Sequence, residues 1–176
     1  MAVKDLSKAR LHAFKRLIKQ AGLDGYFTAA PLEMRYLSGV ELSEGEAVLL
    51  VTLGKTYFFT RTMIVPKMAG VRSFIKVQDV SLGTLTDAAL QAARTAGLKT
   101  VGFAQDKVNF LLGRRLEQAG CVSAGALMDE MRLTKYPDEI AKLQTACRIA
   151  SEAFKEVKPQ IKTGMTEQAV AALLAG

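Results

Sequence analysis

The acidic side chains of this chain are the first candidates for chemistry, because clustered carboxylates and histidines can hold catalytic metal ions. His12 is the only histidine, and it lies on a basic predicted helix, where a histidine usually serves packing or the surface. Neighbouring helix residues point about 100° apart, so Asp138 and Glu139 do not form a catalytic pair. The remaining notable acids fall on different predicted elements: Asp24, Glu33, Asp79, Asp87 and Asp106. The sequence therefore predicts no metal site and no catalytic residue within the chain.

Patterns for nucleophilic catalysis and phosphate binding are also missing. Ser38-Gly39 lacks the Gly-x-Ser-x-Gly arrangement that exposes a nucleophilic serine on a sharp turn, and no histidine is near it in the sequence. The glycines at 97, 102, 113 and 120 end predicted helices or strands and form no phosphate loop. By its own residues, this chain is expected to be inactive as an enzyme.

Helical and strand-like segments alternate through the first three quarters of the chain. Apolar residues at helical spacing predict helices over 6–21, 31–37, 63–69, 82–96 and 106–119. Short β-branched and aromatic runs predict strands over 25–29, 47–53, 56–60, 74–80, 99–104 and 121–127. Gly54-Lys55 joins two of these runs as a hairpin. We expect an α/β fold with a mixed sheet of about six strands and helices on both faces.

The pattern becomes purely helical near Met131. Pro137 suits the first turn of a helix, and Asp138 and Glu139 match the positive end of its dipole. Thr166 is a good N-cap for a second helix over 167–174, which runs almost to the last residue and suggests a truncated domain. We therefore expect one domain over residues 1–131, followed over 132–176 by a linker and two C-terminal helices.

The composition is that of a globular protein, with 49% apolar and 23% charged residues. No apolar run reaches the length of about 18 residues that a membrane span needs, and the charged N-terminus does not resemble a signal peptide. With two cysteines only, a cytoplasmic location is expected. The net charge of +7 is concentrated on the first predicted helix, which favours a solvated face over nucleic-acid binding.

Four short motifs, in order, resemble the creatinase/prolidase/Xaa-Pro aminopeptidase family of pita-bread metallopeptidases. Leu23-Asp24-Gly25-Tyr26-Phe27 resembles the family's entry into its first strand, and Arg35-Tyr36-Leu37-Ser38-Gly39 its Arg-Tyr-Leu-Thr-Gly element. Arg132-x-x-Lys135-x-x-x-Glu139-Ile140 and Gly164-Met165-Thr166-Glu167 resemble its junction between domains. Three positions depart from the pattern: Glu33, near the usual Asn, and Arg61 and Met63, in the usual Thr-Asp-x-Arg-Tyr.

The resemblance implies a creatinase N-terminal-like, ribonuclease H-like fold and a non-catalytic role. The chain would be the N-terminal domain of a metal-dependent Xaa-Pro dipeptidase or aminopeptidase, which acts on proline-containing peptides as a homodimer. Two divalent metal ions, of the Mn or Co type, would be held by two Asp, one His and two Glu of a catalytic domain beyond Gly176. Two alternatives stay open: the N-terminal domain of a creatinase-like amidinohydrolase, and a non-catalytic peptide- or protein-binding module of the same fold.

The resemblance also points to the segment that follows the Tyr36-Leu37-Ser38-Gly39 motif. In relatives, the corresponding loop can reach toward the neighbouring subunit's substrate pocket. Here that loop is Val40 to Glu46. We expect Tyr36, Glu41 and Glu44 to be the residues at the substrate entrance, with a plain solvated acidic loop as the alternative.

Overall fold

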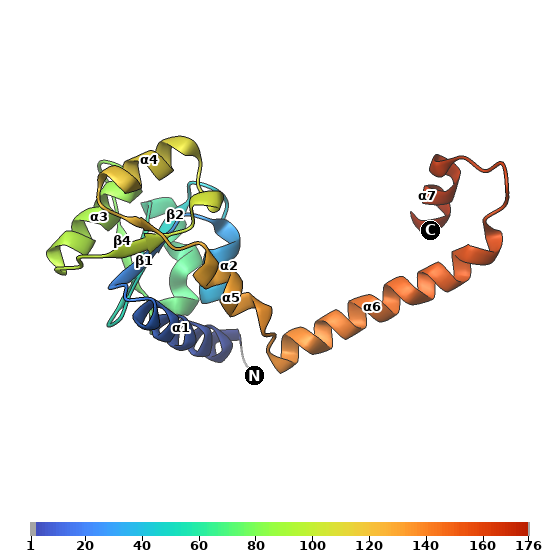
Figure 1. Cartoon of the computed structure of the whole chain (residues 1–176), viewed down its shortest axis with the longest axis horizontal. Coiled ribbons are helices and arrows are strands. Elements are labelled where there is room, and N and C mark those ends of the chain that lie inside the picture. Colours follow the sequence, from blue (N-terminus) through green and yellow to red (C-terminus); the bar gives the residue numbers. More distant parts are fainter. Residues whose placement is uncertain (1–2, 176) are drawn as a thin grey trace. The chain divides into compact units, whose positions relative to one another are not determined.

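The computed structural model describes residues 3–175, shown in Figure 1. It contains two compact units, one that extends to Leu133 and one that begins at Thr134. The predicted boundary between residues 131 and 132 falls inside a helix, α5 (Ala126–Leu133). Met128 and Met131 of this helix are buried in the core of the first unit, which ties the helix to that unit.

A single six-stranded sheet forms the centre of the first unit, with the strand order β4-β3-β2-β1-β5-β6. The strands are β1 (Gly25–Thr28), β2 (Ala47–Thr52), β3 (Thr56–Thr60), β4 (Lys76–Asp79), β5 (Val101–Phe103) and β6 (Val122–Ser123). Only β2 runs against its neighbours, since β1 and β5, β5 and β6, and β3 and β4 pair in parallel. The prediction of a mixed sheet is confirmed.

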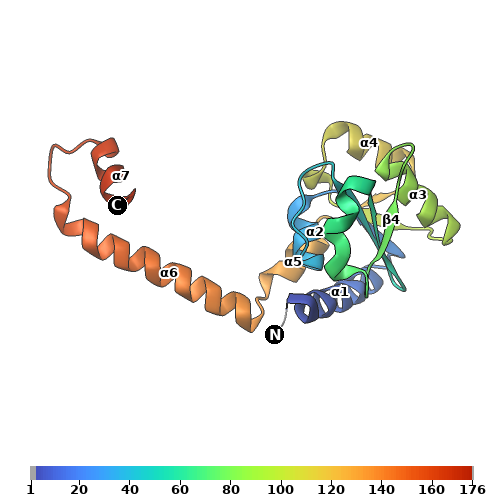
Figure 2. The same cartoon turned by 180° about the vertical axis from the view of Figure 1, so that it is seen from behind.

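Helices cover both faces of the sheet, as Figures 1 and 2 show. One face packs against α1 (Val3–Gln20), α2 (Pro31–Ser38), the 3-10 segment η1 (Thr62–Val71) and α5. The other face packs against α3 (Leu85–Thr95) and α4 (Phe110–Gln118). Strand β2 shows how one strand serves both layers: Leu49 and Val51 join the first core, whereas Val48 and Leu50 join the second.

Capping side chains set two helix starts later than the apolar pattern predicts. Helix α3 begins at Leu85 because the Thr84 hydroxyl accepts a hydrogen bond from the Asp87 N–H, at 3.1 Å. Helix α4 begins at Phe110 because Asn109 caps it by accepting from the Leu112 N–H, at 2.9 Å. The residues before α4 form a separate short 3-10 turn, η2 (Gln105–Lys107).

The last predicted strand, over 121–127, is much shorter in the structure. Strand β6 holds two residues, and α5 begins three residues after it. The segment therefore serves two elements, because Cys121 packs into the core beneath α3 and α4, whereas Leu127 already belongs to α5 and packs against the other core.

The second unit consists of α6 (Pro137–Val157), the short η3 (Lys158–Gln160) and α7 (Glu167–Ala175). Pro137 occupies the first turn of α6, and the Glu139 carboxylate accepts from the Tyr136 N–H at 2.8 Å, which closes a capping box. Ile140, Leu143, Ile149 and Phe154 leave an apolar stripe of α6 exposed. Within residues 3–175, no helix combines the length and the apolar character needed to cross a membrane.

Candidate functional site

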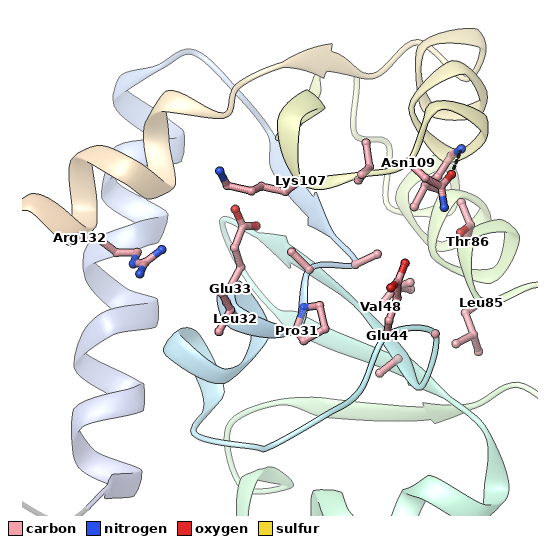
Figure 3. A pocket seen from close by; sticks show the side chains of 16 residues that line it. Pro31, Leu32, Glu33, Glu44, Val48, Leu85, Thr86, Lys107, Asn109 and Arg132 are labelled. Carbon is pink, nitrogen blue, oxygen red and sulfur yellow. Dashed lines mark hydrogen bonds between the residues drawn. The ribbon is translucent and has the colours of Figure 1, made fainter. Parts of the chain in front are cut away.

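The sheet topology creates a pocket at one edge of the first unit. Because β1 and β5 are parallel, their carboxyl ends lie together, and Ala47 at the start of the antiparallel β2 lies at the same edge. Crevices outside the carboxyl ends of parallel strands are common ligand sites in α/β proteins. Here a pocket of about 440 Å³ opens between the residues after β1, η2, α3 and the loop before β2 (Figure 3).

Apolar side chains make most of the pocket wall, including Ala29, Ala30, Val48, Leu85, Val108 and Leu112. The polar groups are fewer and come from separate elements: Glu33, Glu44, Thr86, Lys107, Asn109 and Arg132. An apolar body with a few converging polar groups is the usual make-up of a small-molecule site, and the volume is within the usual range of about 300–1,000 Å³.

Glu33 is the most unusual of these polar groups, because its carboxyl is buried. It is the third residue of α2, where a glutamate normally accepts from the N–H of the N-cap residue. That N–H, of Ala30, already donates to the Thr28 hydroxyl at 3.0 Å. The Glu33 side chain therefore does not cap α2.

The buried Glu33 carboxyl is only weakly satisfied. Oε2 accepts a long hydrogen bond from the Tyr26 hydroxyl at 3.4 Å, and Oε1 accepts none from the described residues. Glu33 is 2% exposed, and burial raises its pKa, with the nearby Thr28 and Tyr26 hydroxyls and Lys107 offsetting part of the effect. Burial also raises the pKa of Tyr26.

The two basic residues of the pocket are engaged by groups outside its lining. Lys107 is ion-paired with Asp106, which raises the pKa of the lysine and lowers that of the aspartate. The Arg132 guanidinium lies 6.0 Å from the centre of the Tyr36 ring. Glu33 and Glu44, by contrast, form no ion pair within the described part of the chain.

The three residues expected at a substrate entrance are placed in different surroundings. Tyr36 is half-buried, with the Arg10 guanidinium of α1 stacked 4.1 Å from its ring centre. Glu41 is exposed and forms an ion pair with Arg35 at 3.1 Å. Glu44 lies on the exposed rim of the pocket. Of these three residues, only Glu44 lines the same pocket as Glu33.

Glu46, the third acid of the same loop, holds the loop in place. Its carboxylate pairs with Lys67 at 2.7 Å and accepts from the Ser43 N–H at 2.8 Å. The hydrogen bond from Lys67 lowers the pKa of Glu46. No group of three or more His, Cys, Asp or Glu that could hold a metal ion occurs among the described residues.

Sequence reasoning missed Glu33, Thr86, Lys107 and Asn109 as members of one site. They come from three separate segments of the chain, α2, α3 and the stretch from Lys107 to Asn109, and neither periodicity nor a motif joins these segments. One usable signal was present: residues that directly follow parallel strands tend to meet at one sheet edge. A second signal was the departure at Glu33 from the usual family residue.

Comparisons with known proteins agree with this fold. Residues 10–134 match the Creatinase/Prolidase N-terminal domain family. The uncharacterized peptidase YqhT of Bacillus subtilis is 26% identical over 167 residues, which are 92% of this chain and 46% of that protein.

Two solved structures are similar over nearly the whole chain. Dipeptidase PepE from Mycobacterium ulcerans has a TM-score of 0.83 at 22% identity and covers 98% of this chain and 49% of its own. X-Pro aminopeptidase from Thermotoga maritima has a TM-score of 0.67 at 26% identity, over 90% of this chain and 47% of its own. The chain thus spans about half the length of these relatives.

The family match covers nearly all of the first compact unit, including the six strands and the helices on both faces of their sheet. With this match over more than half of its length, the chain belongs to the Creatinase/Prolidase N-terminal domain family.

Proposed function

We propose that this chain acts as the non-catalytic N-terminal domain of a Xaa-Pro dipeptidase or aminopeptidase, where it contributes to subunit association and to the active-site entrance. The observation that carries the proposal is the family match over residues 10–134, in a chain that spans about half of its relatives. Relatives with peptidase names favour this reading over a creatinase-like amidinohydrolase.

In this proposal the hydrolytic chemistry belongs to the other half of the protein. Two divalent metal ions of the Mn or Co type would polarise the peptide bond and activate a water there. The described residues of this chain bring together no donor set for such ions, so no catalytic step is assigned to them. The free thiols of Cys121 and Cys147 support a reducing, cytoplasmic setting.

The loop from Val40 to Glu46 is the proposed entrance segment. Glu41 and Glu44 are both exposed and place negative charge on its surface, while the Glu46–Lys67 pair holds the loop's end. Tyr36 lies on the helix from which the loop departs, and its ring contacts the Arg10 guanidinium. Carboxylates at an entrance attract the free α-amine of a peptide and repel its terminal carboxylate.

The residues that follow Gly176 in the longer protein test the reaction class. Two Asp, one His and two Glu in a metal-binding arrangement support the enzyme, and their absence supports the peptide- or protein-binding module. Assays of the longer protein with Xaa-Pro dipeptides and with creatine then separate a peptidase from an amidinohydrolase. Turnover of creatine alone would replace the proposed substrate class.

The entrance role is tested by kinetics of Glu41→Gln/Glu44→Gln in that longer protein. KM for peptides with a free N-terminus should rise a few-fold, because exposed charge pairs are weak, and the effect should shrink in high salt. N-blocked peptides should be nearly unaffected. Glu130→Gln, at an exposed acid of α5, is the matched control. Unchanged kinetics for both peptide types at low salt would leave the loop as solvated surface.

A further inference from the structure

Glu33 and the pocket above it raise a question that the peptidase role does not answer. A buried carboxyl normally has hydrogen-bond or ionic partners, because burying it without them costs free energy. Glu33 is 2% exposed, yet only one of its oxygens accepts a hydrogen bond from the described residues, and that bond is long. The same carboxyl lines a pocket of about 440 Å³ whose walls are mainly apolar (Figure 3).

The charges around the pocket indicate what would satisfy Glu33. Lys107 and Arg132 have partners outside the lining, in Asp106 and in the ring of Tyr36. Two carboxylates, Glu33 inside and Glu44 on the rim, are left without an ion-pair partner in the described chain. The charge of Lys107 is near enough to favour the ionised form of Glu33, but no ion pair among the described residues joins a cation to either carboxylate, so both could accept a further positive donor.

We propose that this pocket binds a small ligand that joins a compact aliphatic body to a protonated amine, with the Glu33 carboxylate receiving the amine. The apolar walls formed by Ala29, Val48, Leu85 and Val108 enclose the body. Glu44 on the rim adds attraction for the positive charge. A charge-assisted hydrogen bond of this kind is stronger than one between neutral groups, especially where water is excluded.

Lys107 is the rival occupant within the chain. Figure 3 shows its ammonium and the Glu33 carboxylate on the same side of the pocket. In the structure this ammonium is held by Asp106. If Lys107 instead turned inward and paired with Glu33, the Glu33 carboxylate would have an ionic partner within the chain. No external amine would then be needed.

The experiment is an NMR titration of the 176-residue chain, with amide shifts followed at neutral pH. The probes are 3-methylbutylamine, which is protonated at that pH, and 3-methylbutan-1-ol, a neutral molecule of nearly the same shape. The amine should give saturable shifts centred on residues 29–33 and 105–109, with an affinity at least about ten-fold above that of the alcohol. Equal affinities, or no saturable shifts with the amine, would overturn the proposal.

Three variants separate charge from shape. Glu33→Gln keeps the side-chain size, and it should weaken amine binding about ten-fold while leaving alcohol binding nearly unchanged. Ala29→Leu fills the pocket without altering its charge and should weaken both probes. Unperturbed amide shifts in β3 and β4 confirm that each variant is folded. An amine affinity that survives Glu33→Gln contradicts the assigned role of this carboxyl.

Lys107→Met tests the rival occupant, because methionine keeps most of the length and removes the ammonium. The proposal expects amine binding in the wild type and equal or tighter binding in this variant. Amine binding that appears only in Lys107→Met would show that Lys107 fills the site in the native chain, and the proposal would then fail.

Discussion

Asp24 shows how one side chain of a short motif acts at the residue scale. It ends the turn between α1 and β1, and its Oδ2 accepts from the backbone N–H groups of Lys99 at 2.8 Å and Thr100 at 2.9 Å. These bonds join segments about 75 residues apart and fix the entry of β5 beside β1. The bonds from Thr100 and then Lys99 lower the pKa of Asp24. The motif residue is thus structural.

We expect Asp24→Ala to lower the melting temperature at neutral pH, and Asp24→Asn to lower it less, because an amide oxygen can still accept both bonds. Folding lowers the pKa of Asp24 below its ordinary value of 3.8, so its ionised carboxylate stabilises the folded protein at any pH above that value. This contribution is lost as the pH falls through the folded pKa. The gap between wild type and Asp24→Ala should therefore narrow in acid. Thermal unfolding across pH measures it, and a gap that stays constant would contradict this account.

Glu33 illustrates the opposite case at the same scale. Its position in the first turn of α2 favours a capping role, but the Thr28 hydroxyl occupies the capped N–H. The carboxyl is buried instead, and Glu33 lines a pocket. A residue type that suits a helix start therefore does not cap this helix.

At the scale of elements, the close approach of β5 to its surroundings depends on a glycine. A Cβ on Gly102 would lie 2.6 Å from the Ala124 Cβ and 2.7 Å from the Leu23 Cδ1. Both distances are shorter than real carbon contacts, and the Ala124 methyl has no other rotamer to adopt. The segment after β6 therefore packs on β5 only because residue 102 has no side chain.

Gly102→Ala should destabilise the fold by about 1–3 kcal/mol through overpacking. Gly113→Ala is the matched control, since its Cβ would meet nothing closer than the Val108 Cγ2 at 3.4 Å and it lies within α4. That change should stabilise by up to about 1 kcal/mol, because alanine is the better helix former. Urea unfolding compares the two, and equal stabilities would show that the space at β5 can relax.

At the scale of the whole molecule, the two compact units differ in how completely they bury apolar surface. The first unit has a core on each face of its sheet. The second unit leaves Ile140, Leu143, Ile149 and Phe154 of α6 between 44% and 57% exposed. Exposed apolar stripes of this kind favour association with another surface.

We expect the first unit to remain folded in a chain of residues 1–134, because both of its cores are formed by residues of that unit. The 176-residue chain should self-associate more strongly than the shorter one, through the α6 stripe. Sedimentation at matched concentrations tests this. Ile149→Glu in the 176-residue chain should reduce association without altering the first unit, and equal sedimentation of all three chains would contradict the role of the stripe.

Local patterns in the sequence determined most elements of this protein and their order. Apolar periodicity and turn residues placed the Gly54-Lys55 hairpin, the Gly22 end of α1 and the Pro137 start of α6, because each depends on neighbours within a few residues. Predictions were least accurate where one apolar run served two elements. The segment over 121–127 is such a case, and it became a two-residue strand followed by α5.

Only the tertiary structure decided what the polar side chains do. Glu41 pairs with Arg35, Glu46 pairs with Lys67, and Glu44 lies beside the pocket, although all three acids belong to one loop. Glu33 and Lys107 lie 74 positions apart and meet because β1 and β5 are parallel neighbours. Contacts of this kind depend on the strand order and on burial in the assembled sheet, and no local pattern in the sequence predicts either one.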